Sequence, residues 1–174
     1  MNQRFQQYSV RLATSDDAGA IAEIYNQGIA TRLTTFETEP RTAQEIQESL
    51  RARGAQYPTV VVCVENRVLA WAGASPYRAR TCYRGVAEFS VYVHRDARGA
   101  GLGHHVLAAL MHECERRGLW KLVSRIFPEN VASRRLCATL GFREVGVYRR
   151  HARLDGAWRD TVIVEKLLGE ARGA

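Results

Sequence analysis

Six consecutive residues combine a basic side chain with closely spaced glycines at the expected start of a helix. They read Arg98-Gly99-Ala100-Gly101-Leu102-Gly103, follow an apolar strand and precede His104. Glycine lets a backbone approach a ligand closely, and the free N–H groups of a first helical turn favour an anion. Arg98 adds a charge-assisted contact. The segment therefore predicts a binding site for a pyrophosphate group.

Three other interpretations of this glycine-rich segment compete with the pyrophosphate site. A dinucleotide-binding turn needs a glycine where His104 stands and an acidic residue about 20 residues further on, and the sequence has neither. A phosphate-binding P-loop ends in Gly-Lys-Ser/Thr, which is also missing. A plain turn before a helix stays open as the structural alternative.

Hydrophobic periodicity and turn residues predict the elements that position this segment. Strands are expected at about 8–13, 59–64, 68–75, 86–93, 121–127, 143–151 and 158–167. Helices are expected after the capping sequence 14–17 and at about 43–52, 102–117 and 130–140. The order β-α-α-β-β-β-α-β-α-β-β predicts an α+β (mixed α/β) fold, mostly antiparallel with a central parallel crossover. Since there is no linker or repeat, we expect one domain over 1–174 with its core at about 8–168.

Charge and hydropathy limit the classes of partner. The net charge of +7, from 25 Lys and Arg against 18 Asp and Glu, suggests a polyanionic ligand. The arginines are spread out and match no helix-turn-helix or RNA-binding signature, so we do not expect nucleic acid as a partner. No apolar run approaches the ~18 residues that span a bilayer, and the N-terminus has no apolar stretch. We therefore expect no membrane partner and a cytoplasmic protein.

The spacing of cysteines and histidines does not predict a metal site. The four cysteines form no C-x-x-C pair, which favours reduced thiols, and we expect Cys63 and Cys114 to lie in the core. His105 and His112 are seven residues apart on one predicted helix, without a third ligand at metal spacing. We therefore expect no metal in the protein.

Two motifs together resemble the GNAT superfamily of N-acetyltransferases. The R-x-x-G-x-G segment at 98–103 resembles its pyrophosphate loop, and Asn130-x-x-Ser133-x-x-Leu136 followed by Leu-Gly-Phe at 140–142 resembles its second cofactor element. Segments 24–26, 35–40, 77–83 and 87–93 are similar to phosphinothricin and methionine sulfoximine acetyltransferases. The resemblance covers about 10–167. It implies a twisted, mostly antiparallel sheet of about seven strands with a splayed parallel pair, flanked by about four helices.

The resemblance also implies that the cosubstrate is acetyl-CoA. In this family the strand before the glycine loop splays from its neighbour, which leaves the backbone at Val91, Tyr92 and Val93 to bind the pantetheine and polarise the thioester carbonyl. Residues 98–104 then hold the pyrophosphate. Asn130 and Ser133 contact the pantetheine and phosphate end.

Glu88 is the candidate general base. It stands three residues before Val91, near the end of an apolar strand, and should lie beside the splayed opening. A carboxylate in a partly dry cleft can take a proton from the substrate ammonium; the alternative is a surface carboxylate without a role. Relatives place Tyr or His four residues before the Gly of Leu-Gly-Phe as the acid for the departing thiolate. This chain has Cys137 there, so either Cys137 or water supplies that proton.

The resemblance implies a pocket for an anionic amino acid. Arg78, Arg80 and Tyr83 precede the Glu88 strand, and paired guanidinium groups suit a carboxylate or phosphinate. Phe36 would wall the pocket, and Tyr92 would reach substrate from the face opposite Val91. The alternative for each arginine is a solvated loop residue.

Three functions remain open from the sequence. The first is acetylation of the α-amine of a phosphinothricin- or sulfoximine-like amino acid, and the second is acetylation of a protein N-terminus, a lysine or a polyamine. The third is a non-catalytic module that binds CoA or nucleic acid. Relatives are often homodimers, so we also expect a homodimer.

Overall fold

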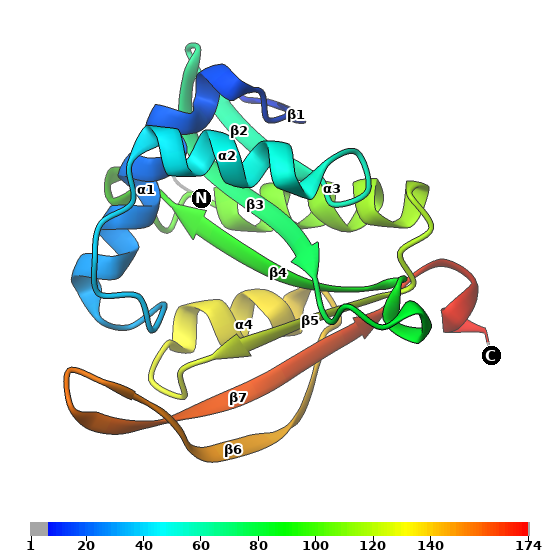
Figure 1. Cartoon of the computed structure of the whole chain (residues 1–174). Helices are drawn as coiled ribbons and strands as arrows, with labels where there is room; N and C mark the ends of the chain where they lie inside the picture. Colours follow the sequence, from blue (N-terminus) through cyan, green and yellow to red (C-terminus); the bar gives the residue numbers. More distant parts are fainter. Residues whose placement is uncertain (1–6, 174) are drawn as a thin grey trace.

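The computed structural model describes residues 7–173, and the seven strands found there form one sheet in the order β1-β2-β3-β4-β5-β7-β6 (Figure 1). The strands are β1 (Ser9–Leu12), β2 (Thr59–Val64), β3 (Arg67–Pro76), β4 (Val86–Val93), β5 (Lys121–Ile126), β6 (Arg143–Leu154) and β7 (Ala157–Leu167). The helices are α1 (Ala18–Thr31), α2 (Ala43–Arg53), α3 (Leu102–Arg116) and α4 (Val131–Thr139). The predicted mixed α/β fold and the predicted element order are confirmed.

One junction in the sheet is parallel, and it is short. β4 pairs with β5 in parallel over only Val86–Glu88, whereas all other neighbouring strands pair antiparallel. Both strands continue past the last pair, Glu88 with Val123, and diverge there (Figure 1). The splayed parallel pair is therefore present, and it opens directly after Glu88.

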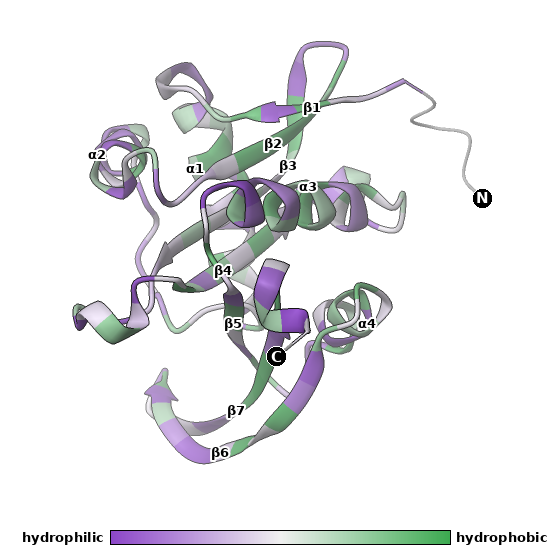
Figure 2. Ribbon diagram, turned by 90° about the vertical axis from the view of Figure 1, so that its right-hand side faces the viewer, coloured by the Kyte–Doolittle hydropathy of each residue, from purple (hydrophilic) through white to green (hydrophobic). Residues whose placement is uncertain are grey.

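Helices cover both faces of the sheet (Figure 2). The contacts of β2 show which helix lies on each face. Its residues are buried at every position from Thr59 to Cys63. Val61 and Cys63 pack in a cluster with Ile21 and Ile24 of α1, whereas Val60 belongs to the cluster that contains α3. Because alternate side chains of a strand point to opposite faces, α1 and α3 lie on opposite sides.

Helix α3 carries the apolar stripe that the sequence predicted. Its side chains Leu102, Val106, Leu107, Leu110 and Cys114 are all buried, at most 1% exposed. These positions fall on one side of a helix with 3.6 residues per turn. The helix thereby fixes the preceding glycine loop at one edge of the splay.

Some details differ from the sequence-based expectation. A short 3₁₀ turn, Ser15–Asp17, precedes α1, because the Asp17 carboxylate accepts from the backbone N–H of Thr14 and holds a tight capping box. Strand β6 continues to Leu154, three residues beyond the expected end. It can do so because bulges interrupt its pairing with β7 without ending it. Within residues 7–173, no helix has the length and apolar character needed to cross a membrane.

Candidate active site

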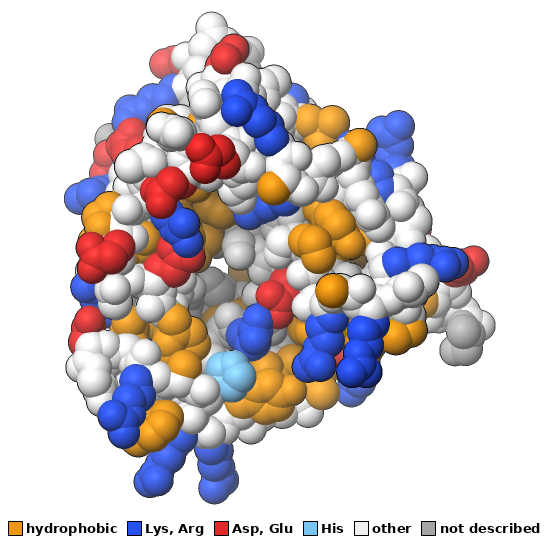
Figure 3. Space-filling view, in the orientation of Figure 1, with side chains coloured by type: hydrophobic (Ala, Val, Ile, Leu, Met, Phe, Trp, Pro, Cys, Tyr) orange, Lys and Arg blue, Asp and Glu red, His pale blue; other side chains and the backbone are white. Residues whose placement is uncertain are grey.

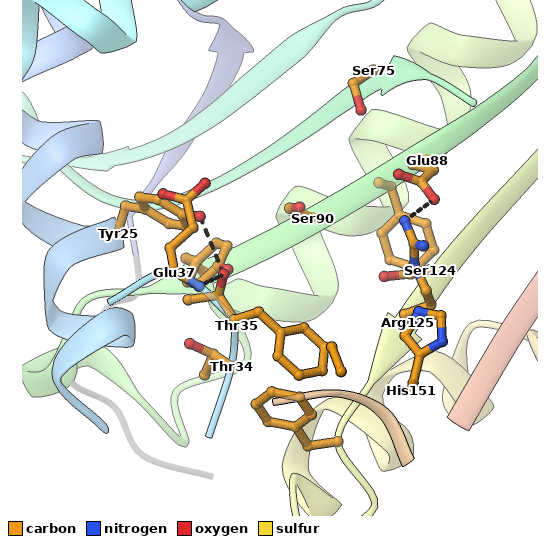
Figure 4. A pocket seen from close by; sticks show the side chains of 15 residues that line it. Tyr25, Thr34, Thr35, Glu37, Ser75, Glu88, Ser90, Ser124, Arg125 and His151 are labelled. Atoms are coloured by element: carbon orange, nitrogen blue, oxygen red, sulfur yellow. Dashed lines mark hydrogen bonds and ion pairs between the residues drawn. The ribbon is translucent and has the colours of Figure 1, made fainter. Parts of the chain in front are cut away.

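A cavity of about 480 Å³ opens where β4 and β5 diverge, and it hollows the face seen in Figure 3. The segment between α1 and α2 forms one side, and β6 forms the rim. Its polar lining consists mainly of hydroxyl groups, with two carboxylates, one guanidinium and one imidazole (Figure 4). The lining includes Tyr25, Thr34, Phe36, Glu37, Ser75, Glu88, Ser90, Tyr92, Ser124, Arg125, Phe127 and His151.

Glu88 and Arg125 form an ion pair in this cavity (Figure 4). Glu88 is the last β4 residue that pairs with β5, and Arg125 stands two residues past its partner Val123. The carboxylate and the guanidinium therefore meet across the point where the strands separate. Their side chains are 29% and 43% exposed, so both can reach a ligand.

A β-bulge places an imidazole at the rim. Tyr148 of β6 pairs with Thr161, and the next paired residue, Ala152, lies opposite Arg159, so the register shifts between them. Arg150 in this bulge has a φ of +49°, a conformation that a non-glycine residue rarely adopts. Bulges redirect side chains near binding sites. The consequence here is that His151 lines the cavity.

Phe36 lines the cavity beside the end of β5. Its ring meets the Phe127 ring edge-on at a centroid distance of 4.8 Å, and the His151 ring lies 6.4 Å away. This aromatic contact joins the segment before α2 to the end of β5. Phe36 therefore forms part of the cavity lining, and its contact with a substrate stays a prediction.

Tyr92 lines the same cavity from a half-buried position. Its ring stacks on Trp71 at 5.0 Å and meets the edge of Tyr25 at 4.9 Å. Burial raises the pKa of the Tyr92 hydroxyl well above its ordinary value, so this group stays protonated at neutral pH. Thr34 lies nearby, and its buried hydroxyl has no hydrogen-bond partner among the described residues. Both hydroxyls are placed to act on a ligand as hydrogen-bond donors.

A second, narrower cavity of about 60 Å³ continues from the first into the splay. The two share Thr34, Tyr92, Ser124 and Arg125, so they form a continuous path. The narrow part is lined by Val91 of β4 and by the α4 residues Asn130, Ser133 and Cys137. Residues of β4 and of α4, the two elements expected to contact the pantetheine, therefore line the same narrow cavity.

Asn130 begins α4 as its capping residue. Its side-chain oxygen accepts from the backbone N–H of Ser133 at 3.1 Å, and its side-chain nitrogen donates to the carbonyl of Leu33 at 3.2 Å. Capping by Asn satisfies a free N–H of the first helical turn. Asn130 therefore links α4 to the segment beside the cavity and also fixes where the helix begins.

The glycine loop presents unpaired backbone donors. Within residues 7–173, the N–H groups of 99–103 have no hydrogen-bond acceptor. Gly99 and Gly101 have φ values of +78° and +83°, and a Cβ on Gly103 would lie 3.3 Å from Leu136 of α4. Arg98 is exposed beside this loop, and its Nε donates to the carbonyl of Val93 at 3.4 Å. These donors at a helix N-terminus fit a pyrophosphate group.

Cys137 lies buried at the inner end of the narrow cavity, with 1% exposure. Burial raises the pKa of its thiol to about 12. A thiol that holds its proton so firmly is a poor acid toward another thiolate, whose pKa is about 8.5 in the free thiol. The environment of Cys137 therefore fits a packing residue better than a general acid.

The structure places Arg78, Arg80 and Tyr83 outside this cavity. Arg78 and Arg80 are exposed, and the Arg78 guanidinium stacks over the ring of Tyr77 at 5.3 Å. Tyr83 packs edge-on against Tyr77 at 5.5 Å. These residues form a loop on the approach to β4, and their role as substrate contacts stays a prediction.

The two basic residues of the cavity, Arg125 and His151, were missed by sequence reasoning. Arg125 stands in a strand that reads Lys-Leu-Val-Ser-Arg-Ile, where the pair Ser124-Arg125 interrupts the apolar pattern and was the available signal. His151 had no comparable signal. It lies in a cluster of basic residues, and only the bulge in β6 turns it toward the cavity.

Comparison with known proteins places the chain in a family. A profile described as an acetyltransferase (GNAT) domain matches residues 9–143. A phosphinothricin N-acetyltransferase from Streptomyces viridochromogenes is 34% identical over 151 residues, which cover 87% of this chain and 82% of that protein. An L-methionine sulfoximine/L-methionine sulfone acetyltransferase from Pseudomonas paraeruginosa is 32% identical over 168 residues, covering 95% and 98% of the two chains.

Solved structures agree with the sequence comparisons. A phosphinothricin acetyltransferase of the GNAT superfamily from Sinorhizobium meliloti, in complex with acetyl-CoA, superposes with a TM-score of 0.89 at 31% identity. The match covers 96% of this chain and 91% of that one. An acetyltransferase structure from Salmonella typhimurium with acetyl-CoA also gives a TM-score of 0.89, at 29% identity, covering 94% and 95% of the two chains. The chain studied here therefore belongs to the GNAT family of acetyltransferases.

Proposed function

We propose that the protein transfers the acetyl group of acetyl-CoA to the α-amine of a small anionic amino acid of the phosphinothricin or methionine sulfoximine type. The observation that carries the proposal is the position of Glu88. Its carboxylate lies in the wide cavity at the end of the β4–β5 pairing, directly before Phe89 and Ser90, which line both the wide and the narrow cavity. An amine in the wide cavity would meet a thioester in the narrow one beside this carboxylate.

Acetyl-CoA would be held by the glycine loop and by the groups that line the narrow path. The free N–H groups of 99–103 and the exposed Arg98 suit its pyrophosphate. The stretch of β4 at Val91, Tyr92 and Val93, which pairs with β3 but not with β5, suits the pantetheine amides, with Asn130 and Ser133 near it at the start of α4. When bound, acetyl-CoA supplies the activated acetyl carbonyl.

The residues of the wide cavity would act on the amine. Glu88 takes the proton that the ammonium must lose before its nitrogen can attack, directly or through one water. The new N–C bond then forms as the C–S bond breaks. The hydroxyls of Tyr92 and Thr34 are among the side-chain donors that line both cavities. The attacking nitrogen loses its second proton as the amide forms, and this proton passes through water to the thiolate, because the buried Cys137 thiol, with a pKa of about 12, keeps its own.

The proposed substrate class rests on the named relatives and on the cavity. The relatives act on phosphinothricin and on methionine sulfoximine. The cavity volume of about 480 Å³ is in the range of small-molecule sites, and its lining combines aromatic side chains with hydroxyls. Arg78, Arg80 and Tyr83 remain proposed contacts at the approach to the cavity.

A homodimer in the cytoplasm completes the proposal. Exposed apolar side chains gather on the β6–β7 hairpin, namely Val145, Val147, Tyr148 and Trp158, each about half exposed. Such a surface on an edge strand is a candidate for burial between two copies. Sedimentation at micromolar concentration tests this: a monomeric mass would exclude the dimer.

Replacement of Glu88 by Gln tests the proposed base. We expect Glu88→Gln to lower kcat about 100- to 1000-fold and to leave the acetyl-CoA dissociation constant within about twofold, because an amide cannot take the proton. Thiol-release kinetics and calorimetric titration measure the two quantities.

Glu37→Gln is the matched control for this experiment. Glu37 lines the same cavity, but its carboxylate is bound to Arg41 at 2.6 and 2.7 Å, and we expect a change of less than about fivefold in kcat. An unchanged kcat in Glu88→Gln at neutral pH would remove Glu88 from the mechanism.

A further inference from the structure

The Glu88–Arg125 ion pair has an unusual position in the cavity. Among the described residues that line the wide cavity, Arg125 is the only Lys or Arg. The other carboxylate in the lining, Glu37, is already bound to Arg41 through two hydrogen bonds. Glu88 and Arg125 are therefore the two complementary charges that the cavity offers to a ligand (Figure 4).

An α-amino acid has the matching arrangement of charges. Its ammonium and its carboxylate are attached to the same carbon, so they lie about one ion-pair distance apart. A guanidinium binds a carboxylate through two parallel hydrogen bonds, and a carboxylate attracts an ammonium. A zwitterion inserted between Glu88 and Arg125 exchanges one ion pair for two.

We propose that Arg125 is a specificity-determining residue that receives the α-carboxylate of the substrate and thereby frees Glu88 for the α-ammonium. This inference rests on the proposed function and adds a residue to it. The loop arginines Arg78 and Arg80 lie outside the cavity, whereas Arg125 stands where the two cavities join. Ser124 lies at the same junction and offers a hydroxyl beside the guanidinium.

The ion pair also predicts which amines the enzyme rejects. An amine without a carboxylate must separate Glu88 from Arg125 and offers the guanidinium no new partner. Separating a charged group from its partner inside a binding site costs free energy. Arg125 therefore competes with such an amine for the base, and the enzyme selects α-amino acids over simple amines.

The test compares methionine sulfoximine with its α-carboxamide, which keeps the amine and removes the negative charge. For the wild-type enzyme we expect the acid to have a kcat/KM at least about 100-fold higher than the amide. In Arg125→Met this preference should fall to within about threefold, mainly through a higher KM for the acid. Arg125→Lys should retain a preference of about tenfold, since it keeps the charge and loses the bidentate geometry.

Two other arginines control for a general loss of positive charge. Arg116 lies on α3 with a side chain that is 66% exposed, and Arg116→Met should keep the full preference. Arg80→Met tests the alternative that the loop arginine binds the α-carboxylate. If Arg80→Met abolishes the preference while Arg125→Met keeps it, the α-carboxylate is bound by the loop and the inference is wrong.

Binding measurements separate this inference from the proposed function. Calorimetry with CoA present should show that Arg125→Met weakens binding of methionine sulfoximine at least about tenfold and does not weaken binding of the carboxamide, which no longer competes with Arg125 for Glu88. Thermal unfolding verifies that each variant is folded. Turnover by the wild type with an unaltered preference in Arg125→Met contradicts only the role of Arg125. No thiol release from any amine, with intact binding of the amino acid through Arg125, contradicts only the transferase function.

Discussion

The chemistry of the site depends on which side chains exchange protons at neutral pH. Glu88 is partly exposed in the wide cavity and has a charged partner that a substrate can replace. Cys137 is buried, and its thiol keeps its proton, with a pKa of about 12. The proposed base at the entrance and the buried thiol at the inner end divide the site into a reacting part and a packing part. We therefore propose that the proton for the departing thiolate arrives through water.

Replacement of Cys137 by Ala tests this division. We expect Cys137→Ala to change kcat by less than about threefold, because a packing residue contributes little to proton transfer. Its unfolding free energy should fall by about 1 kcal/mol, since the smaller side chain leaves a cavity. Thiol-release kinetics and thermal unfolding give both values. A loss of more than about 100-fold in kcat would make the thiol a general acid after all.

The site residues that could be predicted from the sequence are those that lie in a recognisable short segment. Glu88 and Phe36 lie in recognisable segments, and both line the cavity. Arg125 and His151 line it as well, but their roles depend on which strands meet and on a bulge in β6. Sequence periodicity does not report either feature. The loop arginines had a chemical argument in their favour, yet the fold leaves them outside the cavity.

Helix α3 shows how one element supplies the binding loop. Gly101 precedes it with a φ of +83°, and Gly118 follows it with a φ of +73°. Neither site has an atom closer than 3.9 Å to an added Cβ, so sterically the two glycines are similar. They differ in surroundings, because Gly101 belongs to the loop of free N–H groups and Gly118 lies at the opposite end of the helix.

The two glycines form a matched pair of substitutions. Gly101→Ala and Gly118→Ala should each lower the unfolding free energy by about 1 kcal/mol, because both place a Cβ in a left-handed conformation. Only Gly101→Ala should weaken acetyl-CoA binding, by about tenfold or more, since it distorts the loop that faces the pyrophosphate. Chemical denaturation and calorimetry measure the effects. Equal affinities in the two variants would exclude the loop as the anion site.

Element boundaries followed from the sequence wherever turn residues mark them. Strand β4 occupies its predicted range 86–93, and α3 ends one residue from its predicted end, before Gly118. Asp155-Gly156 forms the expected hairpin turn, with both φ values positive. The bulge in β6 escaped prediction because Arg150 adopts its positive φ without any glycine signal.

Considered as a whole, the molecule is a sheet that opens at one junction, with helices holding a loop at one edge. Placing β7 between β5 and β6 depends on contacts between distant segments, and local periodicity contains no information about it. The splayed pair was expected only through resemblance to a family. The net charge of +7 fits an anionic cosubstrate and an anionic substrate.

The most direct test of the account is acetyl-CoA-dependent thiol release with a small panel of amines. The panel contains phosphinothricin, methionine sulfoximine, glutamate, spermidine and a peptide that begins with Ala. We predict turnover confined to the amino acids of the phosphinothricin and sulfoximine type. Turnover only with spermidine or the peptide would contradict the proposed substrate, and bound acetyl-CoA without thiol release from any amine would contradict the transferase itself.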